Sequence, residues 1–471
     1  MDEFDVVVVG AGPTGENLAE RAHAGGLSVA VVESELVGGE CSYWACMPSK
    51  ALLRPAAALT DARRLAGARE AVTGPLDAEA VLRRRDDFTS HWKDDGQAEW
   101  LNGAGLVLVR GHGRLDGPKR VAVDTPDGGR RVLTARHAVA MCTGTRAALP
   151  GLPGLAEVRP WTSREATSSE RVPPRLAVIG GGVVACEMAT AWRALGSEVV
   201  QLVRGSRLLP RMEPFAGESV AESLRASGVD LRFGTSVTGA RRDGQVTLTL
   251  DDGGTVTCDE VLFATGRRPA TDDLGLDTVG LAPGRSVEVD STGLAAGVPG
   301  EWLYAAGDVN GRALLTHQGK YQGRIFGTVI ADRAAGRPLD TAAWGRSVAT
   351  ADERAVPQVV FTDPEVAAVG PTLEEATREG RRVRAVDYEI GDVSGASLYA
   401  DGYQGHARAV VDLDRETLLG VTFAGPGVAE LLHSATIAVT AEVPISRLWH
   451  AVPSYPTISE IWLRLLETYR G

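Results

Sequence analysis

Short apolar runs bounded by glycine alternate along the chain with longer segments whose spacing is helical. The valine-rich run at 4–9 predicts a strand that is buried on both faces. The Ala- and Leu-rich segment after position 15 predicts a helix, and the run at 28–32 a second strand. The same order returns with a run at 175–179, a helical segment ending near 195 and a run at 199–203. Strands that alternate with helices predict an α/β fold with parallel sheets.

The first strand ends in a glycine-rich loop. Gly10, Gly12 and Gly15 would let the backbone turn tightly and approach a pyrophosphate, which the N-terminus of the next helix attracts. The second strand ends at Glu33, whose carboxylate can accept hydrogen bonds from a ribose 2′-hydroxyl. The sequence therefore predicts a dinucleotide site here. The alternative is an α/β turn that only requires glycine.

The second copy of this motif has a different ending. Gly180 and Gly182 are present, with Ala185 in place of the third glycine. The strand that follows ends without an acidic residue, and Arg204 comes next with two more arginines close behind. An acid would repel a 2′-phosphate, whereas arginine can form two hydrogen bonds with it, so this half is expected to prefer NADPH over NADH. The alternative is that these arginines are solvated surface charges.

Cys41 and Cys46 are separated by four residues and follow the first nucleotide motif. The chain has only 5 cysteines, too few for a disulfide-stapled scaffold, so a close pair favours redox or metal chemistry. No further Cys or His lies nearby at ligand spacing, so we expect no metal site. The other open interpretation is a pair of buried apolar residues.

Length and charge narrow the class of protein. With 471 residues the chain should form several domains, and 44% hydrophobic and 23% charged residues are typical of a globular protein. No run of about 20 apolar residues occurs, so no membrane-spanning helix is expected. The net charge of -12 disfavours nucleic acid or an anionic membrane as partner. The acidic N-terminus lacks the basic start of a signal peptide, which indicates a cytoplasmic protein.

Together these motifs resemble the FAD-dependent pyridine nucleotide-disulfide oxidoreductases, a family that includes dihydrolipoamide, glutathione and mercuric reductases. Segments 141–145 and 264–269 are similar to its strand-to-loop crossings, 304–309 to its second flavin motif, and 361–370 to the opening of its dimerisation domain. The resemblance implies an α/β fold with two Rossmann-like dinucleotide-binding domains, for FAD and NAD(P), and a C-terminal α+β dimerisation domain. The expected domains are 1–155 (FAD, first part), 156–273 (NAD(P)), 274–345 (FAD, return) and 346–471 (dimerisation).

The resemblance also implies a reaction. Electrons would pass from NADPH through FAD to a Cys41–Cys46 disulfide, and on to a small disulfide, quinone or other electrophilic acceptor. Cys46 would be the thiolate beside the flavin, and Cys41 the thiol that attacks the acceptor. Lys50 would lie near the flavin and pair with Glu187. The family further implies a homodimer whose active site uses both chains. The remaining cofactor residues that it implies are Thr143, Gly144, Gly266 and Asp308.

The C-terminus departs from the family pattern. The resembling reductases have an acid–base His held by a Glu; here Tyr455 stands at the His position and Glu460 is retained. The usual pKa is ~6.5 for His and ~10 for Tyr, so an unperturbed phenol cannot accept a thiol proton at neutral pH. His450 lies five residues earlier, but Pro453 and Pro456 should prevent a continuous helix from placing it beside Tyr455.

Two alternative functions stay open at this point. A Tyr at this position is similar to mercuric reductase, which favours a metal-ion reductase, although the chain has no cysteine after Cys258. The other alternative is a flavin-bearing redox sensor or assembly partner with little turnover. The redox loop itself also differs from the family, with Glu40, Tyr43, Trp44 and Ala45 where Thr, Asn and Gly are usual.

Overall fold

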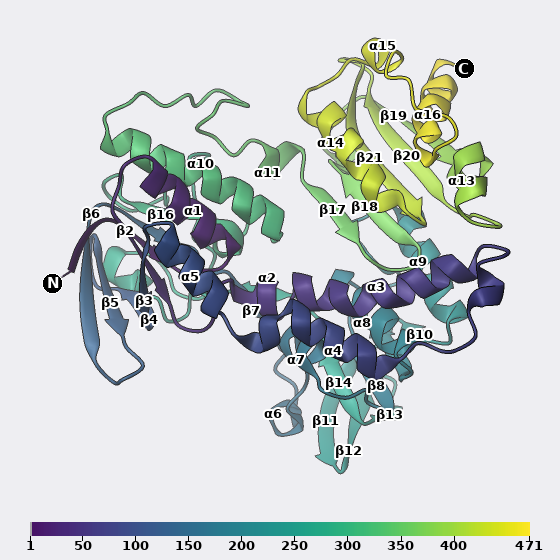
Figure 1. The fold of residues 1–471 in the computed structure, drawn as a ribbon, viewed down its shortest axis with the longest axis horizontal. Coiled ribbons are helices and arrows are strands. Elements are labelled where there is room, and N and C mark those ends of the chain that lie inside the picture. The colour runs from purple at the N-terminus through teal and green to yellow at the C-terminus, as the bar shows by residue number, and fades with distance from the viewer. Residues whose placement is uncertain (1) are drawn as a thin grey trace. The chain divides into compact units, whose positions relative to one another are not determined.

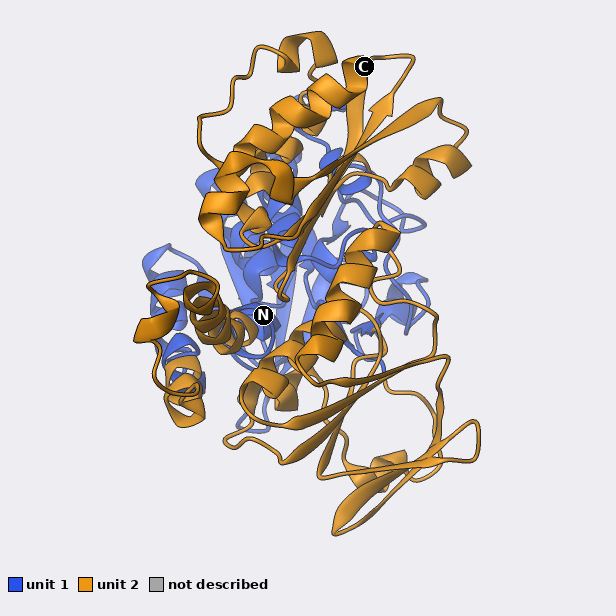
Figure 2. Cartoon of the chain, turned by 90° about the vertical axis from the view of Figure 1, so that its right-hand side faces the viewer, with its two compact units in different colours: residues 1–47, 86–148, 267–353 blue, residues 48–85, 149–266, 354–471 orange. Residues whose placement is uncertain are grey.

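The computed structural model describes residues 2–471, which form two compact units (Figure 2). Unit 1 contains the chain up to Met47 together with residues 86–148 and 267–353. Unit 2 contains residues 48–85, 149–266 and 354–471. Each unit is therefore assembled from three separate stretches of sequence.

Unit 1 is organised around a seven-stranded sheet. The valines of β1 at positions 6–9 are at most 4% exposed, as expected for a central strand covered on both faces. β1 pairs in parallel with β2 and β6, and β6 with β16, whereas β4 and β5 are antiparallel additions at one edge. In sheet order the strands are β3 (Val107–Arg110), β2 (Val29–Glu33), β1 (Asp2–Val9), β6 (Arg130–Met141), β5 (Arg120–Asp124) and β4 (His112–Leu115), with β16 (Leu303–Ala305) beside β6.

Two helices lie side by side against this sheet, α1 (Pro13–Ala24) and α10 (Thr316–Ala334) (Figure 1). Glycines at every fourth position of α10 allow its backbone to approach α1 closely, since a Cβ on any of them would meet α1 within 3 Å. The remaining elements of unit 1 used below are α2 (Gly39–Tyr43), α5 (Asp95–Gly103), β7 (Thr145–Ala147), β15 (Arg267–Pro269) and the 3-10 turn η4 (Gly307–Asn310).

Unit 2 contains a second parallel sheet of nucleotide-binding type, in the order β10-β9-β8-β14. β8 covers Arg175–Ile179, β9 Glu198–Val203, β10 Asp230–Phe233 and β14 Glu260–Phe263. Helices α8 (Val183–Ala194) and α9 (Pro214–Ala226) pack on it. A three-stranded meander, β11 (Val237–Asp243), β12 (Gln245–Leu250) and β13 (Thr255–Cys258), extends this part.

The end of the chain adds a five-stranded antiparallel sheet to unit 2, in the order β17-β18-β21-β20-β19. Its strands are β17 (Pro357–Val360), β18 (Glu365–Val369), β19 (Val383–Glu389), β20 (His406–Asp412) and β21 (Thr417–Gly425). Helices α14 (Leu432–Thr440) and α16 (Ile461–Arg470) pack against it. The other helices of unit 2 include α4 (Ala78–Phe88, which runs into unit 1), α12 (Leu373–Arg378), α13 (Ser394–Tyr399) and α15 (Ile445–Leu448).

The strands expected from the apolar runs are confirmed to within two residues at each end, and the α/β class with two Rossmann-like nucleotide-binding parts and a C-terminal α+β part is confirmed. The domain boundaries at 155, 273 and 345 stay predictions. In the range 2–471, no helix is both long and apolar enough to cross a membrane.

Candidate active site

The two glycine loops have the same local geometry. Gly10 has φ +105°, and a Cβ there would lie 2.4 Å from the carbonyl oxygen of Cys142. Gly180 has φ +137°, and its Cβ would lie 2.4 Å from the carbonyl oxygen of Ala264. Only glycine tolerates this conformation and this approach to the neighbouring strand end. Each loop therefore turns directly from its strand into the helix N-terminus.

The second glycine of each loop faces open space. A Cβ on Gly12 or on Gly182 would meet no atom within 4 Å. In a dinucleotide-binding loop this is where the backbone approaches the pyrophosphate. The pair of loops thus keeps room for a phosphate group beside the N-termini of α1 and α8.

Side chains around the first loop fit a flavin nucleotide. The Glu33 carboxylate accepts hydrogen bonds from the backbone N–H of Ala11 (2.8 Å) and of Glu35 (2.7 Å), and burial raises its pKa. The hydroxyl of Thr143 is buried and has no hydrogen-bond partner in the described chain, which is the mark of a group that a ligand completes. Gly144, next to it, has open space where a Cβ would stand. These features fit FAD.

Asp308 lies in η4 at the end of the second flavin motif. Its carboxylate accepts a hydrogen bond from Thr145 Oγ1 at 2.7 Å, and burial raises its pKa. Arg267 Nε is 4.0 Å from the same carboxylate and donates to Thr145 Oγ1 at 2.6 Å. Gly266, which precedes this arginine, has φ +126° and open space around it.

The structure brings the two redox-loop cysteines together. Cys41 lies in α2, Cys46 is the first residue of α3 (Cys46–Arg63), and both are half-buried and not disulfide-bonded. A hydrogen bond joins their side chains, and Cys46 Sγ lies 3.2 Å from Oγ1 of Thr316, the first residue of α10. Helix N-termini and hydroxyl donors stabilise a thiolate. The surroundings of Cys46 therefore favour a negative charge on its sulfur.

Cys41 is in the opposite electrostatic situation. Its hydrogen bond with Cys46 raises the pKa of the Cys41 thiol above its usual range, and burial adds to this effect. Thr316 and the ammonium of Lys320 lower that pKa but do not outweigh the other two causes. The surroundings of Cys41 therefore disfavour a negative charge on its sulfur.

Lys50 and Glu187 form an ion pair in unit 2. Nζ of Lys50 donates to Oε2 of Glu187 at 2.7 Å and lies 5.0 Å from the centre of the Phe361 ring. Oε1 of Glu187 accepts the backbone N–H of Phe361 at 3.0 Å, and the carboxylate is only 4% exposed. A buried carboxylate with two donors fixes the lysine side chain in one position.

The expected nucleotide-selecting arginine follows β9. Arg204 is exposed, and the segment after it bends back to the glycine loop, where the backbone N–H of Leu209 donates to the carbonyl of Gly181 at 2.8 Å. The far end of this segment is Glu213, whose side chain is 3% exposed. The segment from Arg204 to Glu213 is therefore held by the hydrogen bond of Leu209 and by the buried Glu213, while Arg204 itself is accessible to solvent.

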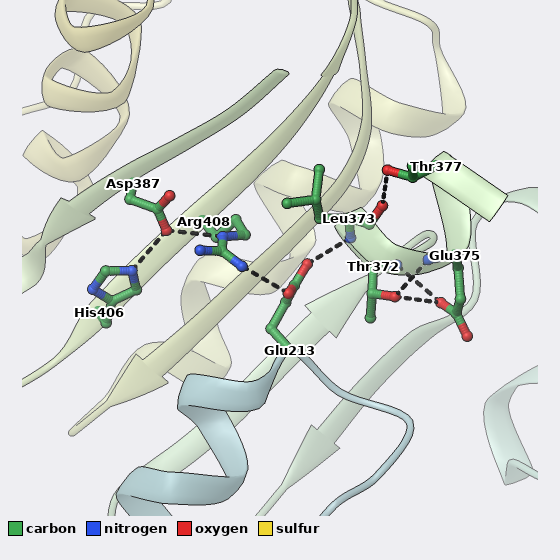
Figure 3. A network of polar contacts seen from close by, with 8 residues as sticks. All are labelled: Glu213, Thr372, Leu373, Glu375, Thr377, Asp387, His406 and Arg408. Atoms are coloured by element: carbon green, nitrogen blue, oxygen red, sulfur yellow. Dashed lines mark hydrogen bonds and ion pairs between the residues drawn. The ribbon is translucent and has the colours of Figure 1, made fainter. Parts of the chain in front are cut away.

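The anchor at Glu213 is a polar network (Figure 3). Its carboxylate accepts the backbone N–H of Leu373 at 2.7 Å and Nη1 of Arg408 at 2.9 Å. Arg408 Nε donates in turn to Asp387 Oδ1 at 2.8 Å, and the same oxygen lies 2.8 Å from Nε2 of His406. The network ties the start of α9 to α12 and to the antiparallel sheet.

The C-terminal residues do not form the acid–base pair of the resembling reductases. Tyr455 is 74% exposed, whereas Glu460 is 7% exposed and accepts a hydrogen bond from Arg464 at 2.7 Å. No hydrogen bond joins Tyr455 to Glu460 in the structure of residues 2–471. His450 is exposed beyond the end of α15, and the chain from 451 to 454 is irregular, as the two prolines predicted.

Sequence reasoning missed three residues of the candidate active site. Thr316 could have been found, because it begins the helix that follows the flavin motif. Arg267 lies in the Thr-Gly-Arg-Arg-Pro segment, but the pattern gives no sign that its guanidinium reaches Glu40. The charge of Lys320 lowers the pKa of Cys41, but the two residues are far apart in the sequence and come near each other only in the folded chain. Across residues 2–471 no group of three or more His, Cys, Asp and Glu side chains could hold a metal ion.

Two glycine-loop nucleotide folds and a close cysteine pair define a dinucleotide-dependent redox protein, and sequence comparison gives the family. Residues 4–323 match the model of the family described as "Pyridine nucleotide-disulphide oxidoreductase". Residues 356–465 match the model of the dimerisation domain of the same family. The chain belongs to the pyridine nucleotide-disulphide oxidoreductases, which are FAD-dependent flavoproteins.

Individual relatives span almost the whole chain. A dihydrolipoyl dehydrogenase 3 from Pseudomonas aeruginosa is 33% identical over 469 residues, which cover 98% of this chain and 96% of the relative. A mercuric reductase from Acidithiobacillus ferrooxidans is 32% identical over 466 residues, 97% of this chain and 81% of the relative. These two relatives act on different substrates, so membership of the family does not fix the acceptor.

A solved structure supports the fold. The Cu(II) complex of the HOCl-induced flavoprotein disulfide reductase RclA from Escherichia coli superimposes with a TM-score of 0.84 over 99% of both chains, at 23% identity. The described chain therefore shares the fold of that structure.

Proposed function

We propose that this protein is an NADPH-dependent FAD oxidoreductase that reduces a small disulfide, quinone or other electrophilic acceptor through Cys41 and Cys46. The observation that supports it most directly is the geometry of the pair, in which Cys46 Sγ lies 3.2 Å from Thr316 Oγ1 at the start of α10, whereas Cys46 and burial raise the pKa of Cys41. FAD, when bound, would supply a two-electron carrier between the nicotinamide and this pair.

The chain's own residues have separate tasks in this proposal. The glycine loops receive the phosphate groups, Thr143 and Asp308 offer polar contacts to the flavin nucleotide, and the Glu187 carboxylate holds Lys50 in place. Cys41 would attack the acceptor once its proton has left, because a thiolate is the nucleophile in exchange chemistry.

NADPH selectivity is the part of the proposal that rests on Arg204. Removing a charged hydrogen bond to the 2′-phosphate costs about 1.5–3 kcal/mol, which corresponds to a KM for NADPH raised about 10- to 140-fold in Arg204→Ala. The KM for NADH should stay unchanged, because NADH has no phosphate there. Arg241→Ala, an exposed arginine of β11 in the same unit, is the matched control. Equal effects on both nucleotides would contradict the assignment.

Acid–base chemistry is proposed to come from a source other than Tyr455. Oε1 of Glu460 is paired with Arg464, and no hydrogen bond joins this carboxylate to Tyr455 in the described chain. We assign the exposed Tyr455 to ligand contact or to the interface of a homodimer whose active site uses both chains. The enzyme is further proposed to act in the cytoplasm, where dithiols stay reduced.

A mercuric-type metal-ion reductase is the second candidate, favoured by Tyr455 at the family's His position and by the mercuric reductases among the relatives. The test is NADPH oxidation by the holoenzyme with Hg(II), disulfides and quinones as separate acceptors, and with NADH as the control donor. Sustained turnover with Hg(II) alone would favour the second candidate. Absence of turnover with every acceptor would favour a redox sensor over both.

A further inference from the structure

The redox loop carries a charge where the resembling family has a neutral threonine. Glu40 immediately precedes Cys41 in α2, and its Oε2 accepts a hydrogen bond from Nη2 of Arg267 at 2.7 Å. Both side chains are 24% exposed, so water screens this pair only in part. The residue that precedes Cys41 is thus one half of a partly buried ion pair.

Arg267 is held independently of Glu40. Its Nε donates to Thr145 Oγ1 at 2.6 Å and its Nη2 to the Thr145 carbonyl at 2.7 Å, and β15 pairs with β7 in the backbone. Loss of the Glu40 carboxylate would therefore leave the guanidinium close to its present position. The contact chain continues from Thr145 Oγ1 to Asp308 at 2.7 Å.

These contacts place two carboxylates, Glu40 and Asp308, around one guanidinium, and Glu40 is the residue next to Cys41 in α2. Reduction of the pair creates a thiolate, and a nearby negative charge disfavours it whereas a positive charge favours it. The position of the disulfide–dithiol equilibrium must then depend on the balance between Glu40 and Arg267.

We infer that Glu40 and Arg267 form an electrostatic pair that sets the reduction potential of the Cys41–Cys46 couple. Arg267 makes the pair easier to reduce, and Glu40 offsets that effect. The inference rests on the proposed function, since it requires that the two cysteines form a reversible disulfide.

The test uses the holoenzyme in anaerobic mixtures of dithiothreitol and its oxidised form. In this exchange the Cys41–Cys46 S–S bond breaks and an S–S bond forms within dithiothreitol, so two electrons and two protons pass to the protein. Alkylation of the free thiols followed by mass spectrometry gives the equilibrium constant. Flavin absorbance relative to protein checks that each variant retains FAD.

We expect substitutions of Glu40 and of Arg267 to shift the disulfide–dithiol equilibrium in opposite directions. Glu40→Gln should shift the equilibrium about three- to tenfold toward the dithiol, a tenfold change being about 30 mV for this two-electron couple. Arg267→Gln should shift it in the other direction by a similar factor, and the double variant should lie between the two. Arg268→Gln, whose arginine pairs with Asp272 on the surface, is the matched control and should stay within twofold of wild type.

If Arg267→Gln loses FAD, the charge series Glu40→Gln and Glu40→Lys replaces it, with the lysine variant expected to shift further in the same direction. Shifts of the same sign in Glu40→Gln and Arg267→Gln, or no shift beyond twofold, would overturn the inference. Failure of the proposed function looks different, because wild type itself would then show no change of two thiols across the whole buffer range.

Discussion

Asp352 is a buried carboxyl that no sequence pattern marks as functional. It accepts hydrogen bonds from the side-chain amides of Gln318 and Gln322, each at 2.9 Å. Gln322 in turn accepts the backbone N–H of Gly307 at 2.7 Å, next to the flavin-motif Asp308. Burial raises the pKa of Asp352 from 3.8 to about 6.

This raised pKa predicts a pH-dependent stability. The folded state holds the Asp352 proton more tightly than the unfolded state, so the contribution is full below pH ~4 and is lost as pH rises through 6. The loss should reach about 3 kcal/mol above pH ~7. Asp352→Asn cannot ionise, so its stability relative to wild type should rise across this range, as urea unfolding at several pH values would measure. A difference that is flat with pH would contradict the assignment.

At the scale of single residues, the sequence predicts the groups that belong to local motifs. The glycines, Glu33 and the two cysteines were identifiable because each sits at a fixed position after a strand. Glu40 and Arg267 lie 227 positions apart and meet only in the folded chain. Such a contact leaves no local signature.

At the scale of elements, the packing of α1 on α10 decides where the first glycine loop lies. Gly319, Gly323 and Gly327 face α1 along one side of α10. A Cβ on Gly323 would lie 2.6 Å from the carbonyl oxygen of Thr14 and 3.1 Å from Cβ of Asn17. Backbone atoms cannot yield as a flexible side chain can, so α1 itself would have to move.

Gly323→Ala is accordingly expected to destabilise the protein. Overpacking costs about 1–3 kcal/mol, and the better helix propensity of alanine offsets up to about 1 kcal/mol of it. The thermal midpoint and the bound flavin fraction should both fall, because the displaced α1 carries the loop that receives the pyrophosphate. Gly103→Ala, at the end of α5 with no atom within 4 Å of the new Cβ, should leave both unchanged or slightly raised.

The elements themselves were largely predictable. β8 covers the apolar run at 175–179, because a short apolar run bounded by turn residues is typical of a buried strand. The breaks between α3, α4 and α5 are harder to predict than the helices themselves. The composition of the stretch from Lys50 to Asn102 is helical throughout, and turn residues such as Gly74 and Pro75 mark the breaks only weakly.

At the scale of the whole molecule, the hardest feature to predict is which stretches of the chain belong to the same compact unit. Residues 48–85 group with 149–266 in unit 2. One reason is Arg85, which is fully buried and donates to the carbonyls of Thr167 at 2.7 Å and Ser169 at 3.0 Å. These partners lie more than 80 residues away, and an arginine in an ordinary helical pattern gives no sign of them.

The C-terminal part of the chain exposes apolar side chains that a homodimer would cover. Val452 is 85% exposed, Tyr455 74% and Ile437 54%, and all three lie in the segment that matches the family's dimerisation domain. Large exposed apolar groups rimmed by polar residues are typical of an interface.

Val452→Asp should therefore weaken the dimer. Burying a carboxylate without a partner costs at least about 2 kcal/mol, so the dissociation constant should rise about 30-fold or more. Sedimentation at decreasing concentration would detect this as a shift from twice the chain mass toward 49.5 kDa. Val107→Asp, on the exposed side of edge strand β3, is the matched control. Equal dissociation constants in both variants would exclude Val452 from the interface.

The central claim is that two electrons from NADPH reach the Cys41–Cys46 pair and leave a thiolate on Cys46. Anaerobic titration of the holoenzyme with NADPH, followed by absorbance, tests it most directly. After two electrons we predict a long-wavelength thiolate–flavin band in wild type, the same band before any reduction in Cys41→Ser, and no band in Cys46→Ser. A band that persists in Cys46→Ser, or a wild type whose flavin bleaches at two electrons without the band, would contradict the account.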